Sequence, residues 1–353
     1  MFEKKIIDKI DKINRPITIE QYIELCLYSK NGYYNNSKIF GKAGDYITAP
    51  EISQLFGEIL SFFFLSFWKN KIKKPFNLVE LGPGRGTLLI DILNITKSFS
   101  DFTKSITINL IEKNIELIKE QKINLSKFNF DFHKINWFDS FNLSINKPVI
   151  IYANEFFDCL PIRQFYKKKN FWYEKNIIFN RRDQCLKFTD RKTINIKTLK
   201  KINNYKPKEI LEISESREDY FIKICKHISI VGGMIIIIDY GYLDRPNHFT
   251  LQSIYNNKKS NVLDNPGLQD ITSLVDFNQL ITIGESYNLK VDIFSTQREF
   301  FLSHGIKKRA KKIMIKSTKQ QKNIIRNGLE RLIDKNNMGS LFKVLVISKT
   351  NDN

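Results

Sequence analysis

The chain has 353 residues, of which 42% are hydrophobic and 13% aromatic. This length and composition exclude a disordered or fibrous chain and a disulfide-stapled mini-protein, and they predict one main fold with an appendage. The formal charge is +20, from 57 Lys and Arg against 37 Asp and Glu. A polyanionic partner would explain this excess. Because the lysines are scattered along the chain, drift in nucleotide composition is the favoured explanation.

No feature of the sequence predicts export, membrane insertion or a metal site. The four cysteines are far apart without CxxC spacing, and the four histidines have no metal-ligand spacing. Residues 1–16 mix acidic residues with lysines, which is atypical of a signal or transit peptide. The longest apolar stretches, residues 59–68 and 230–238, fall short of the roughly 20 residues that cross a bilayer. We therefore expect a soluble cytoplasmic protein.

The N-terminal region is predicted to be helical. Apolar residues recur at helical spacing over residues 17–27 and 52–68, with a Gly-containing loop between these segments. Thr48 precedes Ala49 and Pro50, and Glu51 follows three residues later, so we predict a helix start with a capping box. Residues 1–75 are accordingly expected to form a helical cap.

From residue 76 onwards, short apolar runs alternate with helical patterns. The runs at residues 77–81, 106–111, 149–153 and 234–239 predict parallel strands with crossover helices. Near the end, two further strands at residues 290–296 and 341–348 flank a long basic helical stretch over residues 299–334. The expected fold is therefore α/β, a parallel sheet that ends in an antiparallel pair.

Two insertions interrupt this alternation within the expected domain of residues 76–353. Residues 165–205 begin with a strand-rich segment, and residues 241–275 have few regular periods and many Asn, Asp, Pro and Gly residues. Long irregular segments of this kind are usually binding loops or links.

The strongest local motif is a strand that leads into a glycine-rich turn and then a helix. Glu80 is followed by Gly82, Gly84 and Gly86, and Thr87 occupies the place of the third glycine of a dinucleotide fingerprint. Glycines let the backbone approach a ligand closely, and a carboxylate nearby suits an ammonium group. The spacing favours S-adenosylmethionine over NAD. The alternative is a tight turn without a ligand.

Two acids follow the next predicted strands. Glu112 ends the strand at residues 106–111 and could accept both hydroxyls of a ribose, although a solvated surface acid is the alternative. Asp139 follows Trp137 and Phe138 and could bind an adenine amino group. A helix cap beside core aromatics explains Asp139 equally well.

A second acidic segment follows the strand at residues 149–153. Asn154, Glu155 and Asp158 should lie at the carboxyl edge of the sheet, where ligands bind in open α/β folds. Carboxylates bind a guanidinium bidentately, so these residues predict a cationic acceptor; acids that cap the next helix are the alternative. Asp239 ends a later strand and either contacts substrate or caps the backbone.

These motifs together resemble one family, the MidA-like class I methyltransferases, which include a mitochondrial complex I assembly factor with protein arginine methyltransferase activity. The glycine motif is common to many methyltransferases, whereas the segments around Pro50 and around Glu155 are specific to this family. In place of the family's Arg and His the chain has Gln252 and Asn257. The matching segments are residues 32–34, 44–54, 56–58, 80–88, 154–158, 239–241, 265–267, 270–272, 275–277, 296–297, 338–339 and 341–343.

The resemblance implies a seven-stranded Rossmann-like methyltransferase sheet with a helical N-terminal cap and a β-rich insertion. It also implies S-adenosylmethionine as cofactor and a protein arginine, in a complex I subunit by analogy, as acceptor. Asn154, Glu155 and Asp158 are the expected catalytic residues. Thr48, the glycine turn, Glu80, Glu112 and Asp139 are expected to bind the cofactor, and Asp45, Glu51 and Asp239 the substrate.

Two other functions are compatible with the same sequence. A nucleic-acid methyltransferase would explain the charge, but no NPPY or DPPY tetrapeptide follows the fourth strand. A non-catalytic assembly factor could retain the cofactor for stability alone. A homodimer is also compatible with the sequence.

Overall fold

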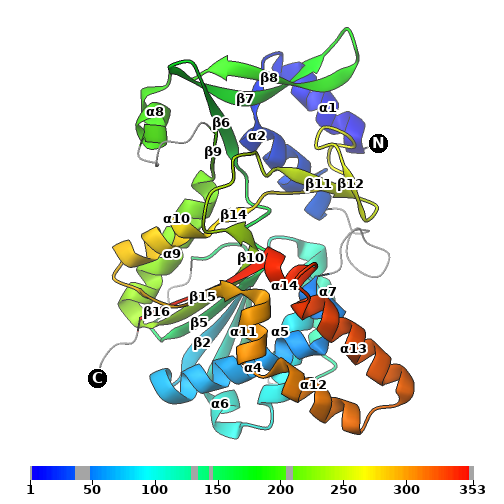
Figure 1. Cartoon of the computed structure of the whole chain (residues 1–353), viewed down its shortest axis with the longest axis vertical. Coiled ribbons are helices and arrows are strands. Elements are labelled where there is room, and N and C mark those ends of the chain that lie inside the picture. Colours follow the sequence, from blue (N-terminus) through cyan, green and yellow to red (C-terminus); the bar gives the residue numbers. More distant parts are fainter. Residues whose placement is uncertain (1, 36–47, 129–133, 143–145, 204–209, 350–353) are drawn as a thin grey trace. The chain divides into compact units, whose positions relative to one another are not determined.

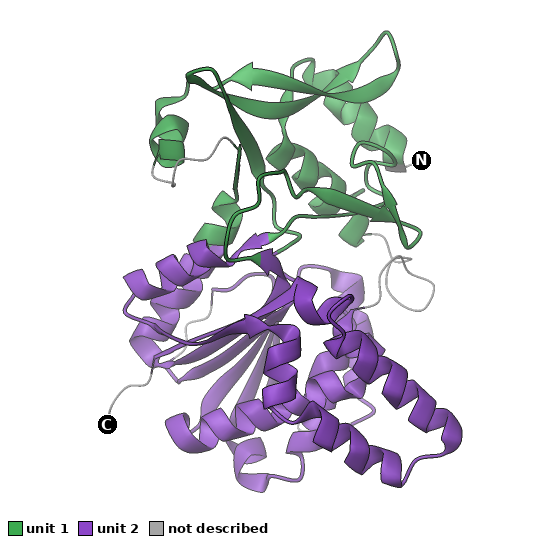
Figure 2. Cartoon of the chain, in the orientation of Figure 1, with its two compact units in different colours: residues 1–46, 158–219, 242–274 green, residues 47–157, 220–241, 275–353 purple. Residues whose placement is uncertain are grey.

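The computed structural model describes residues 2–35, 48–128, 134–142, 146–203 and 210–349. The chain divides into two compact units (Figure 1, Figure 2). Unit 1 comprises residues 1–46, 158–219 and 242–274, and unit 2 comprises residues 47–157, 220–241 and 275–353. Residues 47–75, which we expected in the N-terminal cap, belong to unit 2.

Unit 2 contains the predicted sheet. Its main path has the order β15-β16-β10-β5-β2-β3-β4, and the short β14 (Val275–Asp276) pairs with β10. Strands β4, β3, β2, β5 and β10 are parallel, whereas β16 is antiparallel to both β10 and β15. The strands are β15 (Lys290–Thr296), β16 (Phe342–Lys349), β10 (Gly233–Tyr242), β5 (Val149–Asn154), β2 (Phe76–Leu81), β3 (Ile106–Ile111) and β4 (Ile135–Phe138).

The central strands are mostly apolar because both faces of the sheet are covered. Every residue of β2 is buried, and the first five residues of β5 are buried as well. The predicted strands and their final antiparallel pair are therefore confirmed.

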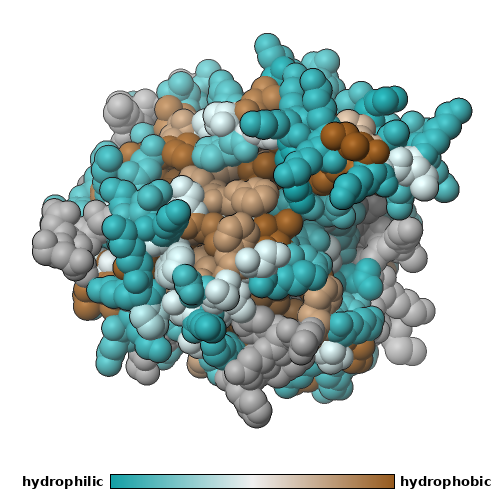
Figure 3. Space-filling view, turned by 90° about the horizontal axis from the view of Figure 1, so that it is seen from below, coloured by the Kyte–Doolittle hydropathy of each residue, from teal (hydrophilic) through white to brown (hydrophobic). Residues whose placement is uncertain are grey.

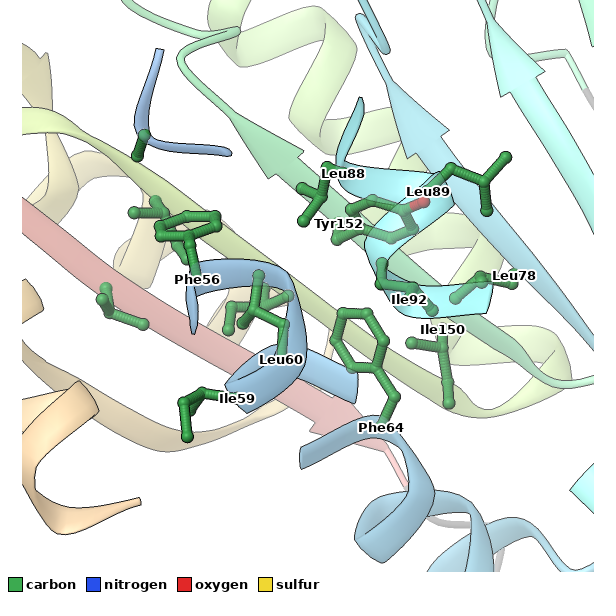
Figure 4. Packing of buried hydrophobic residues seen from close by; sticks show 14 of the residues in the cluster. Phe56, Ile59, Leu60, Phe64, Leu78, Leu88, Leu89, Ile92, Ile150 and Tyr152 are labelled. Carbon is green, nitrogen blue, oxygen red and sulfur yellow. The ribbon is translucent and has the colours of Figure 1, made fainter. Parts of the chain in front are cut away.

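Helices surround this sheet. One face packs against α4 and α5, whose side chains meet Leu78, Ile150 and Tyr152 of the strands (Figure 4). The helices of unit 2 are α3 (Ala49–Ile52), α4 (Gln54–Phe67), η3 (Trp68–Ile72), α5 (Thr87–Thr96), α6 (Ser100–Ser105), α7 (Ile115–Leu125), α9 (Glu215–Val231, beginning in unit 1), α10 (Phe277–Ser286), α11 (Gln297–Ser303), α12 (Ile306–Ile315), α13 (Lys319–Ile333) and α14 (Met338–Leu341).

The long helical stretch expected over residues 299–334 is three helices, α11, α12 and α13. Gly305 has a φ of 80° in the left-handed region, which ends α11. Thr318 and Gln321 form a capping box that starts α13 anew. A basic sequence with helical spacing thus contains two breaks that its period did not show.

Unit 1 is built from the N-terminal helices and both insertions. One sheet has the order β1-β7-β6-β9 with β8 beside β7, and residues 241–275, expected to be irregular, contribute a small sheet of order β12-β11-β13. The elements are α1 (Phe2–Ile13), β1 (Ile17–Thr18), α2 (Ile19–Ile23), η1 (Glu24–Tyr28), η2 (Tyr33–Asn35), β6 (Arg163–Lys168), β7 (Phe171–Asn180), β8 (Cys185–Lys192), α8 (Ile196–Asn203), β9 (Ile210–Ile213), β11 (Gln252–Tyr255), β12 (Lys258–Ser260) and β13 (Asp270–Thr272).

Candidate active site

The predicted site residues of unit 2 lie at the carboxyl edge of its parallel strands. Glu112 directly follows β3, Asp139 follows β4, and Glu155 follows β5. Parallel strands end at the same edge of a sheet, so the topology brings these acids to the edge that carries the glycine turn. Asp45, by contrast, lies outside the described residues.

The glycine turn between β2 and α5 adopts a backbone that only glycine adopts readily. Gly82, Gly84 and Gly86 have φ values of 64°, 53° and 78°. The Gly82 N–H donates to the Ile111 carbonyl of β3 at 3.1 Å, which fixes the start of the turn. A Cβ added at Gly84 would meet nothing within 4 Å. The backbone at Gly84 therefore borders open space that a ligand can fill.

Glu80 lies buried at the end of β2, just before the turn. Its side chain is 4% exposed, and the Tyr152 hydroxyl of β5 donates to Glu80 Oε2 at 2.9 Å. Burial raises the pKa of Glu80 to about 8, against the opposing effect of the Tyr152 hydrogen bond. A cation bound next to Glu80 would restore the charged form.

Glu112 and Asp139 differ in their surroundings. Glu112 Oε1 accepts from the Asn114 N–H at 2.8 Å, and burial raises the pKa of Glu112. Its own N–H donates to the Phe138 carbonyl at the end of β4, at 2.8 Å. Asp139 is exposed, and its Oδ1 accepts from the Ser140 hydroxyl at 2.9 Å. Both carboxylates border the edge of the sheet, Glu112 half-buried and Asp139 in solvent.

Gln121 is a buried residue of the site that sequence reasoning missed. Its Nε2 donates to the Gly84 carbonyl at 2.7 Å, and its Oε1 accepts from Trp137 Nε1 at 2.9 Å. It also hydrogen-bonds the Glu112 carboxylate, which lowers the pKa of Glu112. The Gln121 side chain is 0% exposed. The sequence offered one signal for this role, a polar glutamine on the buried face of the helix that follows β3.

Glu155 has a strained backbone, and its side chain is held by hydrogen bonds. It has a φ of 52°, in the left-handed region that non-glycine residues rarely adopt. Glu155 Oε1 accepts from the Asn154 amide at 2.9 Å and from the Ala49 N–H of α3 at 3.2 Å. A Cβ on Gly82 would lie 2.9 Å from the Phe156 ring. The segment that carries Glu155 therefore packs directly on the glycine turn.

Asp239 supports this segment from β10. Its side chain is 0% exposed, and its Oδ2 accepts from the N–H groups of Phe156 and Phe157 at 3.2 and 2.9 Å. Its Oδ1 accepts from the Tyr240 N–H at 2.9 Å. This is the backbone-capping arrangement, the second of the two roles that the sequence allowed.

Asp158 belongs to unit 1. Its side chain is buried, and its backbone carbonyl accepts from the Ser273 N–H and from Arg217 Nη2, each at 2.9 Å. The Arg217 guanidinium also donates to the carbonyls of Ser273 and Leu274, at 3.1 and 2.9 Å. Hydrogen bonds from Arg217 and Ser273 thus fix the backbone of Asp158 within its unit.

The helix start at Thr48 differs from the prediction. Thr48 is the N-cap residue, but its side chain makes no capping hydrogen bond, so the expected capping box is not formed. The Thr48 backbone carbonyl instead accepts from the N–H groups of Glu51 and Ile52, at 2.9 and 3.1 Å. Burial raises the pKa of Glu51, and the charge of Arg85 opposes this rise. Glu51 is thus a half-buried acid beside the glycine turn.

The residues of the edge fit the predicted cofactor. The glycine turn leaves open space at Gly84, and the buried Glu80 favours a cation, which S-adenosylmethionine carries as an ammonium group. Glu112 offers acceptors that suit ribose hydroxyls. Within the described residues no group of three or more His, Cys, Asp or Glu side chains could hold a metal ion.

Fold and site together define a class I Rossmann-like methyltransferase. A model of a family of S-adenosyl-L-methionine-dependent methyltransferases matches residues 59–295. The chain is 32% identical to a Caenorhabditis elegans protein named as a mitochondrial NDUFAF7 homolog and protein arginine methyltransferase, over 92% of this chain and 81% of the relative. It is 28% identical to mitochondrial NDUFAF7 of Homo sapiens, over 95% and 81%. The chain belongs to this methyltransferase family, and S-adenosylmethionine is its cofactor.

A solved structure supports the fold over the whole chain. A Burkholderia thailandensis protein bound to S-adenosyl-homocysteine matches with a TM-score of 0.85 and 22% identity, over 100% of this chain and 92% of that one.

The comparisons also correct one expectation. We expected a cytoplasmic protein, but the NDUFAF7 relatives are named as mitochondrial. The prediction had rested on residues 1–16, whose acidic residues and lysines are mixed.

Proposed function

We propose that this chain methylates a nitrogen of a protein arginine side chain. The observation that carries the proposal is the position of Glu155, a carboxylate held by Asn154 and Ala49 on a segment that packs against the glycine turn. The NDUFAF7 relatives are named as protein arginine methyltransferases, which supports the same acceptor. By family analogy, the protein substrate is a subunit of respiratory complex I.

The acidic residues would orient the acceptor. A bound S-adenosylmethionine supplies an electrophilic methyl group. An arginine side chain stays protonated in water, so it must give up a proton as the new N–C bond forms, and a carboxylate of the site would accept that proton. The reacting nitrogen must also be turned towards the methyl group. Glu155 and Asp158 can accept guanidinium hydrogen bonds and fix this orientation, which by itself lowers the barrier. In our proposal Asn154 keeps the Glu155 carboxylate in place.

The remaining predicted roles are part of the same proposal. Thr48, Glu80, Glu112, Asp139 and the three glycines of the turn would hold the cofactor, and Asp45 and Glu51 would contact the substrate. For Asp239 we propose a positioning role, because its oxygens accept backbone N–H groups of residues 156, 157 and 240.

The test is methyl transfer to an arginine-containing peptide. We expect Glu155→Gln and Asp158→Asn each to lower kcat by about 100-fold or more while S-adenosyl-homocysteine still binds. Asp190→Asn, on an exposed strand of unit 1, is the matched control and should leave kcat unchanged. Full activity in both site variants would refute the assigned roles.

A second experiment asks whether the chain transfers methyl groups at all. Cell lysate is labelled with radioactive S-adenosylmethionine in the presence and absence of the protein, and the labelled band is identified. A labelled protein band that depends on the chain supports the enzyme. A non-catalytic assembly factor would label nothing, and a labelled RNA or DNA would indicate a nucleic-acid substrate. Sedimentation of the full chain tests the homodimer separately.

A further inference from the structure

Nearly half of the net positive charge of the chain lies on one helical segment of unit 2. Residues 306–335, here called the basic hairpin, contain eleven Lys and Arg and two Asp and Glu, a formal charge of +9 within a total of +20. Its helices α12 and α13 run alongside each other (Figure 1). The lysines are therefore not scattered evenly along the chain. Drift in nucleotide composition does not explain the charge of the basic hairpin.

One face of α12 consists of lysines. Lys307, Lys308, Lys311 and Lys312 recur at helical spacing and are all exposed. Ile306 and Ala310, on the opposite face, are 0% exposed and belong to the main core. The helix is thus amphipathic, with its lysine face directed to solvent.

These lysines have no neutralising partners within the described residues. Arg309 pairs with Glu58 at 2.6 Å, and it is the one basic residue of the hairpin for which the described part of the chain provides a carboxylate within 4.0 Å. Helix α1 offers a contrast, because its lysines alternate with Glu3, Asp8 and Asp11. The lysine face of α12 is a concentrated positive surface.

Apolar side chains lie among these charges. Ile315 is 78% exposed and follows Lys311 and Lys312 by one helical turn, so it lies in the middle of the lysine face. Ile324 of α13 is 61% exposed. On the face of the whole molecule seen from below, hydrophobic side chains gather near the centre and hydrophilic ones surround them (Figure 3). Residues 306–335 contain no Phe, Trp or Tyr, so the stacking residues typical of single-strand binding are absent from this sequence.

We propose that the basic hairpin docks on an anionic lipid surface. Lysine side chains would lie among the phosphate groups, with Ile315 among the upper parts of the acyl chains, as in interfacial amphipathic helices. Docking of this kind is peripheral, and no helix in the described residues is long and apolar enough to cross a membrane. The proposal is independent of methyl transfer, because it uses none of the residues at the sheet edge.

Vesicle flotation of the full chain tests the proposal. We expect binding to vesicles of equal parts phosphatidylcholine and phosphatidylglycerol, and none to vesicles of phosphatidylcholine alone. The variant with Lys307, Lys308, Lys311 and Lys312 each changed to Gln should lose more than about tenfold in partition coefficient. Ile315→Ser keeps the charge and should lose several-fold. Both variants should bind S-adenosyl-homocysteine as the wild type does, which shows that they fold.

The matched control removes four charges elsewhere, by changing the exposed Lys4, Lys9, Lys12 and Lys30 to Gln. An equal loss in this control would overturn the proposal, because net charge alone would then explain binding. Equal binding to both vesicle types would also overturn it. A third contrary result concerns single-stranded RNA. If the four-lysine variant lost binding to vesicles and to single-stranded RNA together, and Ile315→Ser changed neither, the hairpin would be a surface for polyanions in general.

Discussion

At the scale of single residues, Glu80 gives the clearest consequence for stability. Burial raises its pKa from 4.5 to about 8, so between these values the folded chain binds more protons than the unfolded chain. The free energy of unfolding should therefore fall as pH rises through this window, by up to about 1.4 kcal/mol per pH unit. Urea denaturation of the ligand-free protein across the window measures this slope.

Glu80→Gln serves as the comparison, since it keeps the size of the side chain and cannot titrate. We expect the variant to show a shallower slope. Burial also raises the pKa of Asp91 to about 7, so part of the slope should remain. Identical slopes in the two proteins would contradict the raised pKa of Glu80.

The same carboxyl group predicts how cofactor binding depends on pH. A bound ammonium group favours the charged form of Glu80, so affinity for S-adenosyl-homocysteine should rise as pH rises towards 8, by at most about tenfold per unit. Calorimetric titration of wild type and Glu80→Gln at several pH values checks this. A variant that binds as tightly as the wild type, with the same pH dependence, would remove Glu80 from the cofactor site.

Gln121 of α7 is predicted to position the glycine turn for cofactor binding. Gln121→Met keeps the volume but leaves the Gly84 carbonyl and Trp137 Nε1 without their partner, at a cost of about 1 to 3 kcal/mol for each buried group. We expect weaker binding of S-adenosyl-homocysteine, with kcat at saturation less affected. The fluorescence of Trp137 should shift as its N–H loses the bond, with Trp137→Phe identifying the signal.

The control is Gln320→Met, an exposed glutamine of α13. It should alter neither affinity nor fluorescence. A Gln121→Met protein with wild-type affinity would show that the glycine turn keeps its shape without this hydrogen bond.

At the scale of elements, the sequence predicted strands and helices best where the apolar pattern of a segment matches its burial in the structure. Residues 106–111 are β3 as expected, because a mostly apolar run between turn residues leaves little choice, and residues 290–296 are β15 as expected. Breaks in helices were harder to see, since Gly305 and Thr318 lie within a basic stretch of helical period. The polar strands β11 to β13 were missed because they are only four, three and three residues long, too short to show a strand period.

The site shows the same division. The acids and glycines of the sheet edge follow predicted strands, so topology alone placed them together. Tyr152 and Gln121 were not predicted, because their contacts with Glu80 and Gly84 depend on register and helix packing rather than on a motif. The bond of Ala49 to Glu155 is likewise a tertiary contact across more than a hundred residues.

Helix packing around the core predicts the effect of one small substitution. A Cβ added to Gly57 of α4 would lie 2.5 Å from the Asp91 Cβ of α5. Helices α4 and α5 therefore approach each other closely at this position (Figure 4). Gly57→Ala should destabilise the chain by about 1 to 3 kcal/mol, even though alanine favours a helix. Denaturant unfolding checks this. Ser66→Ala, on the exposed side of α4, should change stability by less than about 0.5 kcal/mol.

At the scale of the whole molecule, charge and chemistry have different locations. The sheet edge of unit 2 carries Glu80, Glu112, Asp139 and Glu155, whereas residues 306–335 carry +9 of the net charge of +20. A net charge of +20 therefore does not describe the site, which is acidic. This separation explains why composition alone suggested a polyanion and the motifs suggested a cationic acceptor.

The division into units also predicts where cofactor binding slows hydrogen exchange. The described residues expected to hold the cofactor, from Thr48 to Asp139, belong to unit 2. A ligand that binds only the folded state adds protection against hydrogen exchange where it closes local openings. S-adenosyl-homocysteine should therefore slow exchange most strongly over residues 80–90 and 110–121, at the glycine turn, Glu112 and Gln121. If the strongest protection fell instead on residues 163–192 of unit 1, the cofactor site would have to be reassigned, because no expected cofactor residue lies there.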